Sequence, residues 1–159
     1  MNINGFTEKN INGVFYLESD LLCSLNVKHM FAEKFGGKSE GDFASLNVSF
    51  SRKNRMGDTD SADKVLENYR IALSVLDTSP ESCAAANQVH SNKILCVGEK
   101  NRGANIICES TKGEDALILK DRSNGIDALC VKTADCYRFY YMTEHQKILP
   151  QFMQAGAEV

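Results

Sequence analysis

One histidine and one cysteine lie at places in the chain where a side chain could act on a substrate. His90 ends the segment 87–90, and Cys136 ends the segment 133–136, which follows the apolar segment 126–131. We expect each of them at the end of a strand, where the edge of a sheet can hold a side chain rigidly. An imidazole and a thiolate suit zinc or copper, so the two residues are candidate metal ligands.

A catalytic zinc ion typically has three protein ligands and one position open to water or substrate, so His90 and Cys136 are one ligand short. A bound metal would keep Cys136 as a thiolate and lower the pKa of a coordinated water, which gives a nucleophile at neutral pH. The alternative chemistry is a Cys–His hydrolase, in which His90 is the base for a Cys136 nucleophile. A buried thiol with an unrelated histidine is the structural alternative.

Length and composition limit the kinds of protein that this chain can be. Its 159 residues, 43% hydrophobic and 25% charged, are typical of one folded domain. A net charge of -3 leaves no basic field, so we expect no nucleic-acid partner. No apolar run approaches the roughly 20 residues that cross a bilayer, and the first residues lack the features of a secretion signal. We therefore expect a cytoplasmic protein without a membrane partner.

The cysteines fit reduced thiols better than disulfides. The chain has no secretion signal and no close Cys-x-x-Cys pair, and most cytosolic cysteines are small buried hydrophobes. The six are Cys23, Cys83, Cys96, Cys108, Cys130 and Cys136.

The pattern of apolar residues predicts one good helix and several short strands. Apolar residues recur at three- and four-residue spacing from Ala62 to Leu76, with Asp60 or Ser61 placed to cap the first turn, and we expect the helix to end near Asp77. Strands are expected at 13–17, 43–48, 86–90, 93–97, 115–119 and 126–131, and a loop at 52–60. The fold class is therefore α+β, with mixed β-sheets packed with helices.

Seven short motifs occur in the order seen in the YfiH-like family, and the chain resembles that family from about Val27 to Cys136. The motifs lie at 31–39, 43–48, 57–58, 67–68, 88–90, 115–117 and 133–136. The family is variously named for multicopper polyphenol oxidase (laccase) domains, for peptidoglycan editing and for purine nucleoside phosphorylase activity.

The resemblance implies a zinc site of His, Cys and His near a nucleoside pocket. His90 matches the first family ligand and Cys136 the second, and both would then be catalytic. The implied reaction is phosphorolysis of adenosine or inosine, with adenosine deamination and methylthioadenosine cleavage also attributed to the family. The partners would be a purine nucleoside and phosphate. Phenol oxidation with copper and the removal of wrong amino acids from peptidoglycan precursors are competing descriptions.

Two residues inside the matched region depart from the family. Lys34 stands where an Arg is usual, and Leu119 stands where a Thr is common. The handling of phosphate or substrate at these positions is therefore open.

The end of the chain departs from the family altogether. After Ala-Asp-Cys the family continues with a Pro, an apolar strand and then His-Ala-Gly-Trp-Arg-Gly, whose His is the third ligand. This chain instead continues YRFYYMTEHQKILPQFMQAGAEV. In a codon frame shifted by one base, several junctions give family residues whatever synonymous codons are used: Tyr140-Tyr141 gives Leu, and Met153-Gln154 gives Ala. We infer that one base was lost, or two gained, after the Cys136 codon.

This frame hypothesis sets the expected organisation. Residues 1–136 would be the N-terminal part of a single YfiH-like unit, and residues 137–159 an out-of-frame tail in which His145 has no functional meaning. The α+β fold would be incomplete at the C-terminus. Metal affinity at His90 and Cys136 would fall, because the third ligand is missing.

The sequence thus predicts a metal-dependent purine nucleoside phosphorylase in the intact frame, with zinc as the cofactor. A copper-dependent polyphenol oxidase is the second candidate. An inactive truncated fragment is the candidate for the chain as written, so it stays open whether these 159 residues are an active enzyme. The sequence does not specify an oligomeric state.

Overall fold

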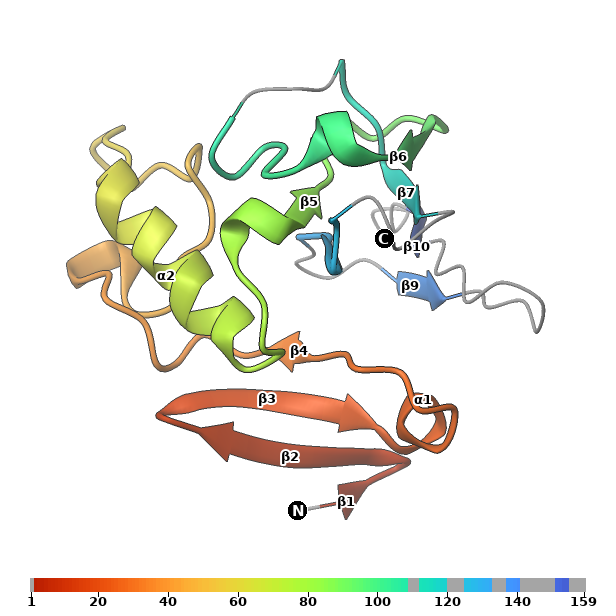
Figure 1. Ribbon diagram of the computed structural model, residues 1–159. Helices are drawn as coiled ribbons and strands as arrows, with labels where there is room; N and C mark the ends of the chain where they lie inside the picture. The colour runs from red at the N-terminus through yellow and green to blue at the C-terminus, as the bar shows by residue number, and fades with distance from the viewer. Residues whose placement is uncertain (1, 109–111, 120–124, 133–136, 141–150, 155–159) are drawn as a thin grey trace. The chain divides into compact units, whose positions relative to one another are not determined.

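The computed structural model describes residues 2–108, 112–119, 125–132, 137–140 and 151–154 (Figure 1). The chain divides into two compact units, Met1–Ser79 and Pro80–Val159. Mixed sheets and a few helices make up the described part, which confirms the α+β prediction. No helix in these ranges is long and apolar enough to cross a membrane. The organisation expected for residues 1–136 and 137–159 stays a prediction.

The first unit contains an antiparallel sheet with the strand order β1-β2-β3-β4. Its strands are β1 (Asn2–Ile3), β2 (Phe6–Ile11), β3 (Val14–Ser19) and β4 (Phe31–Ala32). A two-residue turn joins β2 to β3, since Ile11 pairs with Val14 across it (Figure 1). Asn12 and Gly13 form this turn with φ values of 53° and 87°, which is the left-handed geometry that tight hairpins require.

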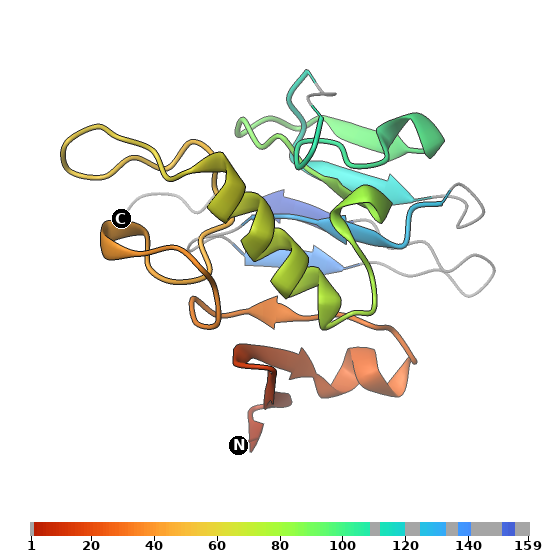
Figure 2. The ribbon, with the colours of Figure 1, turned by 60° about the vertical axis from the view of Figure 1, so that its left-hand side comes forward.

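The predicted helix is confirmed as α2 (Ala62–Ser74), a continuous helix of 13 residues (Figure 2). It ends three residues before Asp77, which has a φ of 56° and closes the turn that follows the helix. Ser61 occupies the N-cap position, but its side chain makes no capping hydrogen bond. The remaining helical segments of the unit are α1 (Asp20–Ser24) and the 3₁₀ turn η1 (Gly41–Phe43).

α2 buries one face in the core of the first unit. Its most buried side chains are Val65, Asn68, Tyr69, Ala72 and Leu73. A cluster of Val14, Leu46 and Ala72 forms the apolar centre, with Met30, Ile71 and Val75 packed against it.

The strand expected at 43–48 is wrong. After η1 the chain continues as a loop, in which the Leu46 N–H donates to the Lys34 carbonyl and the Ser45 carbonyl accepts from Ser39. These single contacts to a neighbouring loop replace the repeated ladder of a sheet, so the apolar residues here pack without forming a strand. The loop expected at 52–60 is confirmed, apart from an isolated bridge between Lys53 and Thr59.

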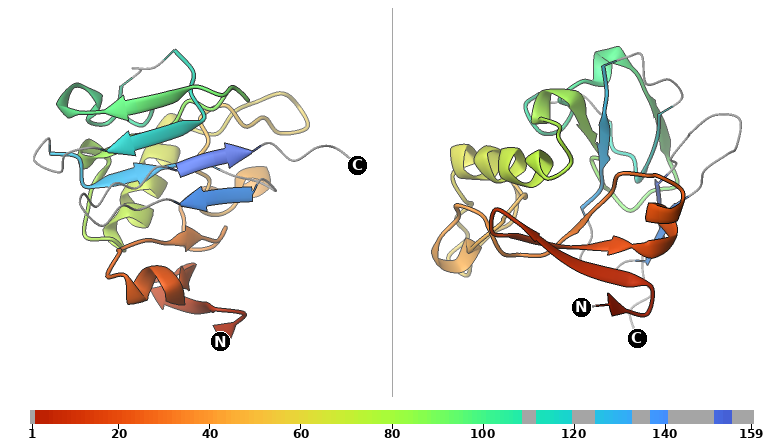
Figure 3. Two further views of the ribbon diagram at one scale, coloured as in Figure 1. Left: turned by 90° about the vertical axis from the view of Figure 1, so that its right-hand side faces the viewer. Right: turned by 60° about the horizontal axis from the view of Figure 1, so that its bottom comes forward.

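The second unit contains a mixed sheet with the order β6-β7-β10-β9 and a two-stranded parallel sheet of β5 and β8. In the larger sheet β6 and β7 are parallel, and β10 is antiparallel to β7 and β9 (Figure 3). The strands are β5 (Cys83–Ala85), β6 (Ile94–Val97), β7 (Ala116–Leu119), β8 (Ala128–Cys130), β9 (Tyr137–Tyr140) and β10 (Gln151–Gln154), with 3₁₀ turns η2 (Pro80–Ser82) and η3 (Glu99–Asn101).

The core of the second unit is a cluster of small and branched apolar side chains. Its buried members are Ala84, Ala86, Val97, Ala104, Leu117, Leu119 and Ile126. The strands expected at 93–97, 115–119 and 126–131 are confirmed as β6, β7 and β8. The strand expected at 86–90 is wrong, because β5 lies upstream of it and these residues form a loop.

Candidate functional site

The loop 86–93, between β5 and β6, carries His90. β5 and β8 pair in parallel, with Ala85 opposite Cys130. The carboxyl ends of parallel strands meet at one edge of a sheet, so this loop and the segment that leads to Cys136 leave from the same edge. Cys136 itself lies outside the described residues.

The side-chain amide of Gln88 joins this loop to the segment after β8. Its Nε2 donates to the Lys132 carbonyl over 2.6 Å, and the Lys132 N–H donates to Gln88 Oε1 over 2.8 Å. The two bonds imitate one rung of a β-ladder. They hold the loop against a residue four positions before Cys136. Sequence reasoning named Gln88 only as part of the motif 88–90.

His90 lies at a turn within the loop, and its side chain is exposed. Its φ of 57° is in the left-handed region, and its backbone N–H donates to Asp115 Oδ1 over 3.0 Å. The N–H and the hydroxyl of Ser91 donate to Asp115 Oδ2 over 2.6 and 2.8 Å. The prediction that His90 ends a strand is therefore wrong, because a carboxylate binds the backbone here in place of a neighbouring strand.

Asp115 is a buried carboxylate directly before β7. Burial raises the pKa of Asp115, but hydrogen bonds from Ser91, His90 and Val89 outweigh this effect, so its pKa lies below the ordinary value of 3.8. The side chain is ionised at neutral pH and is a strong acceptor. Sequence reasoning missed this role, and the only signal was the position of Asp115 in the motif 115–117.

A metal ion at this loop would draw on His90 and Cys136. Within the described ranges, no group of three or more His, Cys, Asp or Glu side chains is placed to hold a metal. The imidazole of His90 and the thiolate of Cys136 are ligands that suit zinc. His90 is exposed, and Gln88 bonds its loop to Lys132, four residues before Cys136. Ligation by these two residues stays a prediction.

His29 and Cys83 have structural roles. His29 Nε2 accepts a hydrogen bond from the Ser19 N–H over 2.7 Å, and His29 Nδ1 lies 2.8 Å from the Val27 carbonyl oxygen. Burial, with a smaller contribution from Cys130, raises the pKa of the Cys83 thiol, so this cysteine is a protonated core residue. Cys23, Cys83, Cys96 and Cys108 form no disulfide.

The two departures from the family pattern also have defined surroundings. Leu119 is 8% exposed and belongs to the core cluster of the second unit. The Lys34 ammonium lies 5.1 Å from the centroid of the Phe35 ring. His145 lies outside the described residues.

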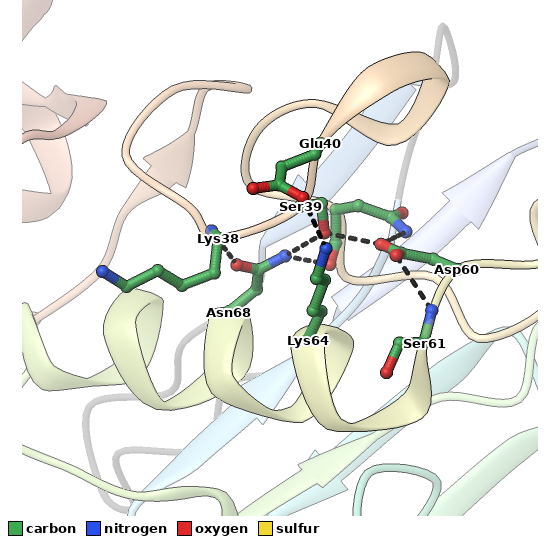
Figure 4. A network of polar contacts seen from close by, with 8 residues as sticks. Lys38, Ser39, Glu40, Asp60, Ser61, Lys64 and Asn68 are labelled. Carbon is green, nitrogen blue, oxygen red and sulfur yellow. Dashed lines mark hydrogen bonds and ion pairs between the residues drawn. The ribbon is translucent and has the colours of Figure 1, made fainter.

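Asn68 of α2 is the centre of a polar network in the first unit (Figure 4). It is fully buried, and its Oδ1 accepts from the Lys38 N–H over 2.6 Å. Its Nδ2 donates to Ser39 Oγ and to the Asn47 carbonyl, each over 2.8 Å. Three of the family-like motifs, 31–39, 43–48 and 67–68, therefore meet at one side chain.

Asp60 extends this network to the start of α2 (Figure 4). Its Oδ2 accepts from the Ser39 hydroxyl and from Asn47 Nδ2, and its Oδ1 accepts from the Ser61 N–H. Burial raises the pKa of Asp60, but these hydrogen bonds and the nearby Lys64 ammonium outweigh it and hold the pKa below 3.8.

The contribution of Asp60 to stability should be lost in acid. A carboxylate whose pKa is lower in the folded state stabilises the fold above its unfolded pKa, and this contribution disappears as pH falls through 3.8 to the folded value. Urea unfolding should therefore give a difference in unfolding free energy between wild type and Asp60→Asn that is larger at neutral pH than at pH about 3. Ser61→Ala removes no titratable group and is the control. An Asp60→Asn difference that stays constant with pH would contradict the prediction.

Comparison with known proteins supports the family resemblance. The family described as "Multi-copper polyphenol oxidoreductase laccase" matches residues 28–151. No curated protein matches the chain.

Two solved structures share the fold. The hypothetical protein YfiH of Bacillus licheniformis is 21% identical with a TM-score of 0.75, and YlmD from Geobacillus stearothermophilus is 23% identical with a TM-score of 0.78. In each case the match covers 95% of this chain and 52% of the other, so the chain spans about half the length of these structures. Since the family match covers well over half of the chain, the chain belongs to the multi-copper polyphenol oxidoreductase laccase family, which includes the YfiH-like proteins.

Proposed function

We propose that the intact reading frame encodes a metal-dependent purine nucleoside phosphorylase, with His90 and Cys136 as zinc ligands. The observation that carries this proposal is the parallel pairing of β5 with β8, together with the bonds between Gln88 and Lys132. These contacts direct the His90 loop and the residues directly after β8 to the same edge of a sheet. The family resemblance supplies the reaction.

In phosphorolysis, a phosphate oxygen bonds to C1′ of the ribose while the bond from C1′ to the purine nitrogen breaks, and the released base takes up a proton. A bound zinc ion would supply a Lewis acid with a position open to phosphate, ribose or water. His90 and Cys136 would hold that ion. Gln88 and Asp115 would fix the loop, so that little rearrangement is needed when substrate binds.

Copper-dependent phenol oxidation is the second candidate, and the family's name, which refers to multi-copper oxidoreductases, favours it. Copper sites in proteins draw heavily on imidazole ligands, and the chain has three histidines. Both ring nitrogens of His29 are in contact with the backbone. This leaves His90 as the available imidazole among residues 1–136, and either metal would take it.

The proposed function is tested by comparing the 159-residue chain with a version in which one base is restored after the Cys136 codon. Each is purified with zinc and incubated with inosine, with and without phosphate, and hypoxanthine is measured by chromatography. We expect phosphate-dependent release of hypoxanthine from the restored protein. His90→Ala and Cys136→Ser should each lower kcat/KM at least about a hundredfold, since even outer partners of a metal site cost ten- to a hundredfold.

Cys96→Ala is the matched control, because Cys96 is an exposed free thiol on β6. Its activity should stay within about twofold of wild type, as surface substitutions rarely perturb a fold. Full activity of the 159-residue chain would contradict the inactive-fragment alternative. Copper-dependent oxidation of a phenolic dye, without phosphorolysis in either protein, would support the oxidase instead.

A further inference from the structure

The loop that carries His90 is built around the carboxylate of Asp115. Both oxygens of this carboxylate are used, one by the His90 N–H and the other by the N–H and hydroxyl of Ser91. The hydroxyl of Ser91 also accepts from the Lys93 N–H over 3.3 Å. The buried Asp115 carboxylate thus accepts hydrogen bonds from the backbone N–H groups of two consecutive residues, His90 and Ser91.

The backbone of His90 is in the left-handed region, which few non-glycine residues adopt. Six non-glycine residues in the described ranges have positive φ, and all of them except His90 are Asn or Asp. The left-handed conformation costs an L-residue with a larger side chain about 1 kcal/mol or more, so it persists only where its surroundings impose it. At this position the bonds to Asp115 impose it, and the histidine is present despite the cost.

Asp115 is itself held rigidly. It is 4% exposed, and its N–H donates to the Lys93 carbonyl over 3.1 Å. This bond extends the parallel ladder of β6 and β7, in which Ile94 pairs with Ala116. The backbone of Asp115 is therefore held by the pairing of β6 and β7, and the loop is hydrogen-bonded to the Asp115 carboxylate.

We propose that Asp115 is a positioning residue, which fixes the left-handed turn at His90 and so holds the imidazole ready to bind the metal. The part of this inference that concerns metal binding rests on the proposed function. The turn itself can be measured without any metal present.

The test combines amide hydrogen exchange with zinc affinity. In Asp115→Asn, exchange of the His90 and Ser91 amides should be at least about tenfold faster, because each loses a charge-assisted hydrogen bond. Zinc affinity, measured by competition with a chelator, should fall about ten- to a hundredfold, as is typical when a group that orients a ligand is removed. Ser91→Ala removes the hydroxyl contact and keeps the backbone contacts to Asp115, so its exchange rates should lie between those of wild type and Asp115→Asn.

Two further variants separate positioning from ligation. His90→Asn should keep the turn, because Asn tolerates positive φ, and should lose the zinc affinity that depends on the imidazole. Lys93→Ala is the matched control, since it alters an exposed side chain of the same loop and keeps the backbone carbonyl that Asp115 uses. It should resemble wild type in both measurements.

Unchanged exchange at His90 and Ser91 in Asp115→Asn would overturn the inference. Faster exchange throughout the second unit would also overturn it, because Asp115 would then support the fold as a whole. If Asp115→Asn does not fold, the exchange rates of the His90 and Ser91 amides in Ser91→Ala test the inference instead. Equal zinc affinity in wild type and His90→Asn would instead contradict the proposed function, while the exchange rates would still decide the role of Asp115.

Discussion

Replacing Gly37 with alanine should destabilise the first unit by about 3 kcal/mol, at the upper end of the range for overpacking. A Cβ atom at this position would overlap the Ser45 carbonyl oxygen and the Cα of Leu46, and it would lie 2.6 Å from Asn68 Oδ1. Two of these neighbours are backbone atoms, which cannot move aside as a flexible side chain can. The Gly37 N–H also donates to Ser45 Oγ over 2.9 Å, so the two loops are held at this separation.

Urea unfolding of Gly37→Ala measures this effect, and Gly57→Ala is the control. Gly57 has a φ of 92° and open space where a Cβ would lie, so alanine there adds backbone strain of about 1 kcal/mol without a steric clash. Gly37 has the opposite character, because its crowding and not its φ forbids a side chain. Gly37→Ala should therefore lose more stability than Gly57→Ala, and the reverse order would contradict the steric argument.

The elements that the sequence predicted correctly are those with a strong local pattern. α2 follows from apolar residues at helical spacing, and β3 from a run of aromatic and branched residues. β2 was missed because its residues are mostly polar and exposed, and pairing with β3 through the Asn12-Gly13 turn makes it a strand. The apolar residues at 43–48 suggested a strand, but contacts with the neighbouring loop at Lys34 and Ser39 decide their conformation.

The sequence predicted the chemical types of the candidate ligands, but not the contacts that hold them in place. His90 and Cys136 could be named from their residue types and from the family resemblance. The pairing of Ala85 with Cys130 joins residues 45 positions apart, and no local pattern reveals such a contact. The role of Asp115 was hidden for a related reason, since its partners are mostly backbone groups, whose positions depend on the fold.

Five of the seven family-like motifs form two groups in the structure. Those at 31–39, 43–48 and 67–68 meet around Asn68, and those at 88–90 and 115–117 meet around the turn at His90. The motifs of the first group bind two loops to Asn68 of α2, whereas those of the second group position the exposed imidazole of His90. Substitutions in the first group should therefore act mainly on stability, and those in the second mainly on metal binding.

Asn68→Ala should destabilise the first unit by about 3 kcal/mol, because one truncation leaves several buried groups without partners. The Lys38 N–H, the Ser39 hydroxyl and the Asn47 carbonyl each lose a hydrogen bond of 2.6 to 2.8 Å. Arg70→Ala on the same helix is the matched control, since Arg70 makes an exposed ion pair with Glu67, whose loss should cost well under about 1 kcal/mol.

Asn68→Asp separates the hydrogen bonds of this side chain from its size. One oxygen can still accept from Lys38, but the second oxygen faces the Asn47 carbonyl, which can only accept. Burial raises the pKa of such a carboxyl, so the variant should be least stable at neutral pH and should recover relative to wild type as acid protonates it. This trend is opposite in sign to that of Asp60, whose carboxylate has donors for both oxygens. Urea unfolding at neutral pH and at pH about 5 would show it, and a variant as stable as wild type at both would mean that Asn68 fills space without organising the loops.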